Sequence, residues 1–378
     1  MSNRYFFSWR KLINWLVCAL LLGLAACAQL PDQPVKTKTK DSALVFPPPP
    51  EEARFVFERV IYGSADVVPE KEESSLKKLV VGTTEHGGND PLRKPYAVAV
   101  HRGRIFVSDT VARVVKVFDV PEGRYFTVGD SDPGRLMKPL GIDVDDAGTL
   151  YVADATTKHI LIYDRDGKFL RQLGGPSMFD RLTSVTVDKK GERLYVVDIG
   201  GVSSENHRVR VMDAHSGNVL FDIGKRGNGP GELNLPRDVA IGKGGSLYVV
   251  DGANFRIQVF DSNGKYLRNF GQVGKQYGSF ARPKEASTDA NGNLYVIDAA
   301  FGNFQIFSPD DDLLLFIGDR SAEDGPAQYM LPSGIYVDED GRVYMVDQWF
   351  HKLEVYRPAA LAPQDGYLGK KHNAETSR

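Results

Sequence analysis

Apolar and polar residues alternate in short runs along most of this chain. In residues 139–174 the segments PLGIDV, TLYVAD, HILIYD and FLRQLG place apolar side chains on every second position, and turn sequences such as DDAG and DRDG separate them. A period of two that is broken by turns rich in Asp and Gly is typical of short antiparallel strands. We therefore predict that this stretch forms one four-stranded sheet.

The same unit recurs six times. Its second strand has the form aromatic-x-x-Asp, and the copies RIFVSD, TLYVAD, RLYVVD, SLYVVD, NLYVID and RVYMVD follow one another at intervals of 44 to 53 residues. Periods near 45 residues indicate propeller blades, because one four-stranded sheet cannot bury both faces whereas sheets around a common axis can. The prediction is an all-β, six-bladed β-propeller with four-stranded antiparallel blades over residues 54–357.

Closure of the ring requires a strand from the other end of the chain. Residues 54–63, RFVFERVIYG, resemble the outer strands FLRQLGG and YLRNFG, whereas the sixth unit stops after its third strand at KLEVYRP. We predict that the N-terminal strand completes the last blade. Residues 70–82, EKEESSLKKLVVG, are expected to form a short amphipathic helix at one end of the ring.

Each copy of the repeated strand ends in an aspartate. A carboxylate at the end of a strand that opens a tight connection accepts hydrogen bonds from the backbone N–H groups of that connection. A residue that occurs once in every blade is expected to serve the architecture rather than a single chemical step. The aspartates are Asp109, Asp154, Asp198, Asp251, Asp298 and Asp347.

The first 27 residues are basic, then apolar, and end in LAAC at Cys27, which is the order of a secretory signal rather than of a membrane-spanning helix. LAAC resembles a bacterial lipobox, which implies a signal peptide over residues 1–26 and a lipid anchor on Cys27. An ordinary signal peptide with a chance Cys is the alternative. Ala28, where an Asp would favour the inner membrane, favours the outer one, so we expect a lipid-anchored envelope protein that faces the periplasm or the cell surface.

The segments that flank the propeller lack its periodicity. Residues 27–53 are polar and contain four consecutive prolines, which predicts a stiff tether, and residues 358–378 are predicted to be a disordered tail. The formal net charge of −2 becomes −5 without the basic residues that precede Cys27. We therefore expect no nucleic-acid partner. A chain with one remaining cysteine has no internal disulfide, and we expect it to be a monomer.

Residues 224–271 resemble a named repeat. GKRGNGPGELNLPRDVAIGKGGSLYVVDGANFRIQVFDSNGKYLRNFG is similar to an NHL repeat, with its Gly-rich loop, a Pro before the inner strand, LYV-x-D and FD-x-x-G. The resemblance covers residues 91–357 and is weakest in the third copy, where Leu182 replaces the proline. The chain as a whole resembles bacterial NHL-type propeller lipoproteins.

Candidate binding residues emerge where equivalent positions differ between repeats. After the opening proline the first strand carries small or neutral residues in some copies but Arg237, Asp238, Lys284 and Glu285 in the fourth and fifth. In propellers these strand starts line the mouth of the central channel, so the four side chains are expected to meet there. The alternative is that they neutralise one another, Arg237 with Glu285 and Lys284 with Asp238.

Aromatic residues are expected on the same face, in the connections between the second and third strands. Exposed rings beside charges are typical of binding surfaces, although these rings could also cover blade edges. They are Phe255, Phe301, Trp349 and Phe350, beside His351.

These patterns favour a non-catalytic propeller that binds a protein, polymer or small ligand at its channel mouth. The alternative is a calcium- or zinc-dependent hydrolase or lyase, because relatives with similar propellers include lactonases and amidating lyases. Asp143, Asp238 and Glu285 are the possible calcium ligands, but Arg237 and Lys284 alongside would repel the ion. No other cofactor is expected. Further side chains considered for a metal are Glu85, His86 and Asp90, which lie close in sequence, and His159, His207 and His351, which fall on different blades.

Overall fold

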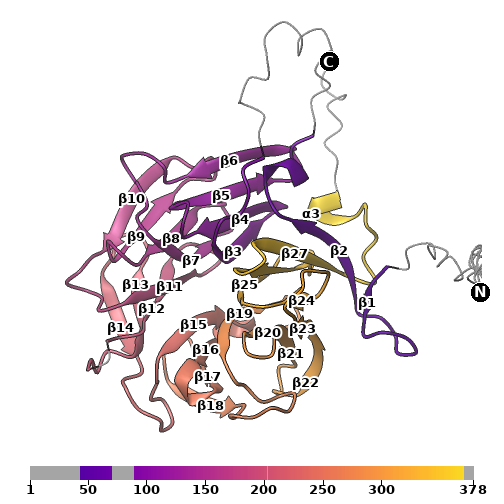
Figure 1. The fold of residues 1–378 in the computed structure, drawn as a ribbon. Coiled ribbons are helices and arrows are strands. Elements are labelled where there is room, and N and C mark those ends of the chain that lie inside the picture. The colour runs from indigo at the N-terminus through magenta and orange to yellow at the C-terminus, as the bar shows by residue number, and fades with distance from the viewer. Residues whose placement is uncertain (1–42, 70–88, 202, 370–378) are drawn as a thin grey trace, which may run out of the picture. The chain divides into compact units, whose positions relative to one another are not determined.

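The computed structural model describes residues 43–69, 89–201 and 203–369, and these form a ring of six antiparallel sheets (Figure 1). The innermost strand of each sheet contacts the innermost strand of the next, and the last contacts the first, so that the ring is closed. The predicted six-bladed β-propeller is confirmed.

Each blade runs from the channel outwards in chain order. Blade one contains β3 (Pro95–His101), β4 (Arg104–Asp109), β5 (Val114–Asp119) and β6 (Arg124–Val128). Blade two contains β7 (Pro139–Val144), β8 (Leu150–Asp154), β9 (His159–Tyr163) and β10 (Phe169–Gly174). Blade three contains β11 (Leu182–Val187), β12 (Arg193–Asp198), β13 (Arg208–Asp213) and β14 (Val219–Ile223).

The remaining blades continue this order. Blade four contains β15 (Pro236–Ile241), β16 (Leu247–Asp251), β17 (Arg256–Phe260) and β18 (Tyr266–Phe270). Blade five contains β19 (Pro283–Thr288), β20 (Leu294–Asp298), β21 (Asn303–Phe307) and β22 (Leu313–Ile317), and the short parallel pair β23 (Asp319–Arg320) and β24 (Gln328–Tyr329) follows it. Blade six contains β25 (Pro332–Val337), β26 (Val343–Asp347) and β27 (Lys352–Pro358), with the N-terminal strands β1 (Val45–Phe46) and β2 (Phe55–Ile61) at its outer edge.

The N-terminal strand closes the ring as predicted. Strand β2 pairs antiparallel with β27, and Figure 1 shows the indigo β2 beside the yellow β27. Strand β1 then pairs with β2, with Val45 opposite Val56, so blade six has five strands. The two residues of β1 fall within the segment predicted to be a tether, which therefore contributes to the sheet before the propeller range begins.

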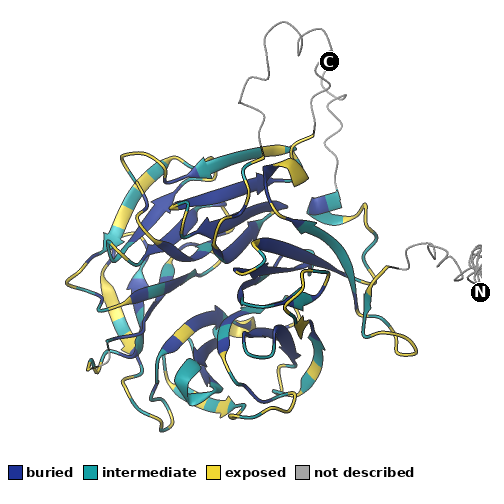
Figure 2. Ribbon diagram, viewed as in Figure 1, coloured by how far each residue is buried: buried dark blue, intermediate teal, exposed yellow. Residues whose placement is uncertain are grey.

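The core lies between neighbouring blades, because each blade buries both of its faces. In β26, Val343 and Met345 pack towards blade five, whereas Tyr344 and Val346 pack towards blade one. All five residues of that strand are buried. Figure 2 shows the same dark interior in the middle strands and paler outer strands. A strand with two buried faces needs apolar residues at consecutive positions, which explains motifs such as LYVVD.

The segment after β27 differs from its prediction as a disordered tail. Residues 366–369 form the short helix α3 (Gly366–Gly369), whose Leu368 is buried against blades six and one. The backbone N–H of Tyr367 donates to Asp340 Oδ2 at 2.6 Å, and Arg342 donates to the carbonyl oxygen of Asp365 at 2.9 Å. These contacts hold residues 365–368 against blade six.

Several sequence predictions concern residues outside the described ranges. They are the signal peptide, Cys27, most of the tether, the helix at 70–82, Glu85, His86 and the last nine residues. Among the helices of the described part of the chain, none is long and apolar enough to cross a membrane.

Candidate functional site

The repeated aspartates hold together the loops around one end of the channel. Asp154 accepts four backbone hydrogen bonds, from Met137 and Lys138 just before β7 at 2.6 and 2.8 Å, and from Thr156 and Thr157 just after β8 at 3.0 and 2.9 Å. Its carboxylate therefore ties the entry to the innermost strand to the connection between the second and third strands. We call the face where these loops lie the mouth face.

The other blades repeat this arrangement. All six aspartates are fully buried, and each accepts at least one N–H from the residues that precede the innermost strand of its blade. In blade four, side-chain donors replace some of the backbone donors to Asp251, and one of them is Arg256 Nε at 2.9 Å. A buried carboxylate whose oxygens all accept hydrogen bonds from N–H groups connects the loops that carry these groups, and it is not available to a ligand.

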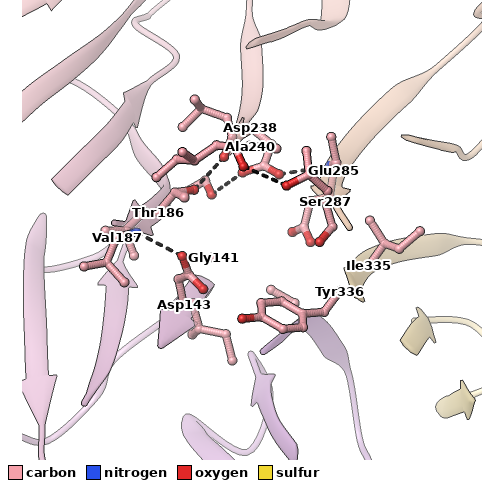
Figure 3. Close-up of a pocket in the computed structure, with 18 of the residues that line it drawn as sticks. Gly141, Asp143, Thr186, Val187, Asp238, Ala240, Glu285, Ser287, Ile335 and Tyr336 are labelled. Carbon is pink, nitrogen blue, oxygen red and sulfur yellow. Dashed lines mark hydrogen bonds between the residues drawn. The ribbon is translucent and has the colours of Figure 1, made fainter. Parts of the chain in front are cut away.

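The innermost strands enclose a cavity of about 210 Å³ in the channel (Figure 3). Its polar lining comes from blades two to six and is rich in carboxyl and hydroxyl groups. The polar lining residues are Asp143, Ser184, Thr186, Lys189, Asp238, Glu285, Ser287, Thr288 and Tyr336. Of the residues predicted to bind a ligand, Asp238 and Glu285 line this cavity, together with the possible metal ligand Asp143.

Two of these carboxyl groups link neighbouring blades. Asp238 accepts from Ser184 Oγ at 2.7 Å and from the backbone N–H of Ala286 at 3.0 Å, and so joins blades three, four and five. Asp143 accepts from the N–H of Val187 in β11 at 2.9 Å. Burial raises the pKa of Asp143 and of Asp238 to about 6, although the backbone hydrogen bonds oppose this shift.

Glu285 differs from these two because its carboxyl group is only partly bound. Its exposed fraction is 8%, and Oε1 has no hydrogen-bond partner within the described residues. Burial, and next the negative charge of Asp238, raise the pKa of Glu285 well above its usual value. Figure 3 shows Asp143, Glu285 and Tyr336 around a common space. A buried acceptor that faces a cavity without a partner identifies a position for a ligand donor.

The position that follows the opening proline by two residues points at the neighbouring blade. A Cβ atom on Gly141 would lie 2.6 Å from the Cα of Ser184, and one on Gly334 would lie 2.8 Å from the Cα of Ala97. Small residues are therefore required where two innermost strands approach closely. The variation along this position, from which the sequence analysis selected candidate binding residues, therefore also reflects different contacts between blades.

The basic residues of the mouth do not form the ion pairs that the sequence allowed. Within the described residues, Ser184 and Ala286 bind the carboxylate of Asp238, in place of Lys284. Arg237 is exposed and lies against Gly252, where an added Cβ would be 2.7 Å from Arg237 Cγ. Neither Arg237 nor Lys284 lines the cavity.

Lys284 belongs to a cluster of cations at the rim of the channel. Burial and then the charge of Arg282 lower its pKa to about 8, and Arg237 acts in the same direction. We call Arg237, Arg282 and Lys284 the basic rim. Repulsion within the rim is relieved when an anionic group binds there. The sequence analysis missed Arg282, which directly precedes the proline that opens blade five.

The four predicted aromatic residues have different environments. Trp349 is 60% exposed, whereas Phe255 packs against the core between blades four and five. The ring of Phe350 lies 5.4 Å from Nζ of the buried Lys352. Phe301 is half-buried. Phe255 and Phe350 therefore cover the blades, and Trp349 is the large exposed ring of the set.

Trp349 is held rigidly on the mouth face. The N–H groups of Trp349 and Phe350 donate to Asp347 Oδ1 at 2.7 and 2.8 Å. Asp347 pairs with Pro332 at the start of β25, which places this loop at the channel mouth. Burial of such a ring by a partner costs little conformational entropy, because the backbone that carries it is already fixed.

The possible metal ligands are close in the fold but do not form a metal-binding group. Among the described residues, no set of three His, Cys, Asp or Glu side chains is placed to hold a metal ion. Asp143 and Asp238 direct oxygens to backbone donors, as described above. His207 is buried and accepts from the N–H of Leu235 at 3.2 Å. Asp90 forms an ion pair with Lys116 at 2.6 Å.

Comparison with protein families places the chain among propellers. An NHL repeat matches residues 233–260, and a family described as a 6-bladed beta-propeller matches residues 136–203. The chain contains an NHL repeat and folds as a six-bladed β-propeller.

Two curated relatives with similar sequences have different descriptions. The chain is 33% identical to human NHL repeat-containing protein 3 over 232 residues, which cover 56% of this chain and 64% of that protein. It is 30% identical to a Caenorhabditis elegans protein described as a probable peptidyl-alpha-hydroxyglycine alpha-amidating lyase over 114 residues, which cover 29% of this chain and 31% of the relative. The chain thus spans between about a third and two thirds of the length of these relatives.

Solved structures share the fold at low sequence identity. A gluconolactonase from Xanthomonas campestris aligns with a TM-score of 0.55 at 14% identity, over 80% of this chain and 98% of that one. A catalytically inactive virginiamycin B lyase from Staphylococcus aureus, crystallised with quinupristin, aligns with a TM-score of 0.51 at 15% identity, over 72% and 82%. These similarities support the architecture alone.

Proposed function

We propose that this protein is an envelope-anchored, non-catalytic binding protein that holds an anionic partner, a protein or a polymer, on its mouth face. The observation that carries the proposal is the concentration of exposed cationic side chains on this face of a chain whose formal net charge is −2. These side chains are Arg93, Lys94, Arg113, Lys138, Arg181, Arg237 and Arg282.

The hydrogen bonds of the aspartate ring support the position of these cations. The backbone N–H groups of Lys94, Lys138 and Arg181 donate to the aspartates of their own blades at 3.2, 2.8 and 2.8 Å. Arg282 does the same at 2.9 Å. Each of these four residues stands directly before the innermost strand of its blade, around the channel mouth. Local positive potential attracts anionic partners even when the whole protein is acidic.

Trp349 adds an apolar anchor beside the charged surface. Aromatic side chains that are exposed on a fixed backbone are common centres of binding energy, with charged residues around them. The mouth face combines both kinds of group, the cations for attraction and orientation and the indole for burial. Such a surface fits a partner that brings anionic groups next to an apolar patch.

The anchor is a separate part of the proposal and rests on the sequence. Lipidation of Cys27 would attach the chain to the membrane, and we place it on the outer membrane with the propeller in the periplasm or at the cell surface. Anchoring keeps the domain close to its partner, which raises the effective concentration of both.

A metal-dependent hydrolase or lyase is the second candidate, suggested by the lyase among the curated relatives. The channel carboxylates favour the binding function over this one. The carboxylate oxygens of Asp143 and Asp238 accept hydrogen bonds from neighbouring blades. A catalytic metal instead needs several ligands that converge on one open point.

The sequence provides a built-in probe for the test. Its three tryptophans are Trp9, Trp15 and Trp349, and the first two lie in the predicted signal peptide, so the mature chain would carry Trp349 as its sole indole. Fluorescence of this chain is then titrated with dextran sulfate, an anionic polymer, and with uncharged dextran. We expect a saturable change with dextran sulfate that weakens as salt is added, and no change with dextran.

Matched variants locate the binding surface. Arg237→Ala combined with Arg282→Ala should weaken binding at least tenfold, whereas Arg124→Ala, with an exposed side chain at the start of the outer strand β6, should not. Equal losses in both variants would show that charge attracts the polymer without a defined site. Absence of binding at low salt would refute the anionic partner.

A further inference from the structure

The cavity inside the channel has a charge opposite to that of the basic rim. Its lining includes the carboxyl groups of Asp143, Asp238 and Glu285 from three different blades, and Lys189 is its cationic residue. Lys189 is exposed, and its Nζ lies 5.9 Å from the ring centre of Tyr336. The anionic partner proposed for the mouth face does not suit this interior, because carboxylates repel anions.

We propose that this cavity binds a small organic cation, an ammonium or guanidinium group that donates N–H bonds to Glu285 and Asp143. This goes beyond the proposed function, since it concerns the interior of the channel and a ligand of opposite charge. The first support is geometric, because the unpartnered Oε1 of Glu285 and the carboxyl group of Asp143 face the same space as the hydroxyl group of Tyr336.

Hydrogen-bond accounting supports an N–H donor over a metal ion. Asp143 and Asp238 each use oxygens to accept backbone or hydroxyl donors from neighbouring blades, so they retain lone pairs but cannot turn towards one central ion. Directional donors on a planar guanidinium or a tetrahedral ammonium reach separate acceptors. A calcium ion requires six or more oxygens at one point, which this lining does not bring together.

The size of the cavity sets the class of ligand. A volume of about 210 Å³ accommodates an organic molecule of several heavy atoms and excludes a folded chain. The same cationic chemistry can come from a free amine or from the side chain of a peptide that enters the channel. Both sources present the same head group to Glu285.

Electrostatics predicts a proton linkage. Glu285 holds its proton more tightly than usual because of burial and the charge of Asp238, while Lys284 next to it acts in the opposite direction. A bound cation favours the charged carboxylate, so binding should release protons and strengthen as the pH rises. Asp143 and Asp238, with pKa values of about 6, add to this dependence at the lower end.

The test is calorimetric titration of the full chain with agmatine and with guanidinium chloride, against n-butanol as an uncharged control. Glu285→Gln is the site variant, since it keeps the shape and removes the charge, and Glu52→Gln on an exposed residue is its matched control. We expect binding of the cations, at least tenfold weaker binding to Glu285→Gln, and unchanged binding to Glu52→Gln. A capped Gly-Arg-Gly peptide distinguishes the two sources: tighter binding of agmatine indicates a free amine, and tighter binding of the peptide indicates a threaded side chain.

The wild-type protein gives an independent readout if Glu285→Gln fails to fold. Titrations in two buffers with different heats of ionisation report proton release, and a net release of protons on binding of agmatine is expected. No binding of either cation at millimolar concentration, or binding without proton release and with equal affinity for Glu285→Gln, would overturn the inference. Binding of dextran sulfate by the Glu285→Gln variant would separate this failure from failure of the mouth-face proposal.

Discussion

Replacement of Asp154 by alanine tests whether the aspartate ring is structural. Alanine would leave the N–H groups of Met137, Lys138, Thr156 and Thr157 without their acceptor. One hydrogen bond to a charged group contributes about 1.5–3 kcal/mol, and a buried donor that loses its partner costs about 1–3 kcal/mol. Because Met137, Lys138 and Thr156 are exposed, water can replace part of the loss, and we expect a destabilisation of about 3 kcal/mol rather than the sum of four bonds.

Thermal unfolding measures this effect. One kcal/mol shifts the unfolding temperature by roughly 2–3 °C in a large domain, so Asp154→Ala should unfold on the order of 6 °C below the wild type. Asp154→Asn, which keeps one acceptor oxygen, should fall between the two. Asp310→Ala removes an exposed aspartate and serves as the control. If Asp154→Ala unfolds at the wild-type temperature but no longer binds the ligand, the residue belongs to a binding site and the structural interpretation is wrong.

Three further predictions concern the anchor, the metal alternative and the channel carboxylates. Cys27→Ser should move the protein from the membrane fraction to the soluble fraction, and a protein that stays in the membrane fraction would contradict lipidation. In titrations with calcium and with zinc, we expect no micromolar binding at Asp238 and Glu285. Micromolar binding to the wild type that is lost in the Asp238→Ala, Glu285→Ala double variant would instead favour the enzyme. The pKa of Asp238 is raised from 3.8 to about 6, so the folded state binds more protons between these values and loses stability as the pH rises through them. Relative to the wild type, Asp238→Asn should therefore gain about 2–3 kcal/mol between pH 4 and pH 7 in urea unfolding, and a constant difference would refute the shift.

The repeat pattern was sufficient to predict the propeller because every blade carries the same signals. LYV-x-D segments need two buried faces, and a missing fourth strand after KLEVYRP needs a partner from the N-terminus. The contacts of β1 and α3 were not predicted. Val45–Phe46 is too short to show a period, and Leu368 packs through a single side chain in a segment without periodicity.

The site was predicted less completely because its charges are arranged in space rather than along the sequence. Net charge suggested no affinity for polyanions, yet cations cluster on the mouth face because Lys94, Lys138 and Arg282 each precede the innermost strand of a different blade. Tyr336 was missed although it occupies the same repeat position as Asp143, which the analysis did select. Comparison of all six copies at that position would have found it.

Opposite charges coexist on consecutive residues of β19. Lys284 and Glu285 lie where the pairing of β19 with β20 shifts register, between Pro283 and Ala286, and Glu285 lines the cavity while Lys284 belongs to the rim. Each charge partly offsets the cost of burying the other, because Lys284 favours the ionised form of Glu285 and Glu285 favours the charged form of Lys284. A ligand that supplies an anion to the rim and a cation to the cavity would satisfy both groups at once, and its orientation would be fixed by that polarity. Such a ligand should bind more tightly than agmatine or a simple anion alone, because both partial charges are neutralised in one event.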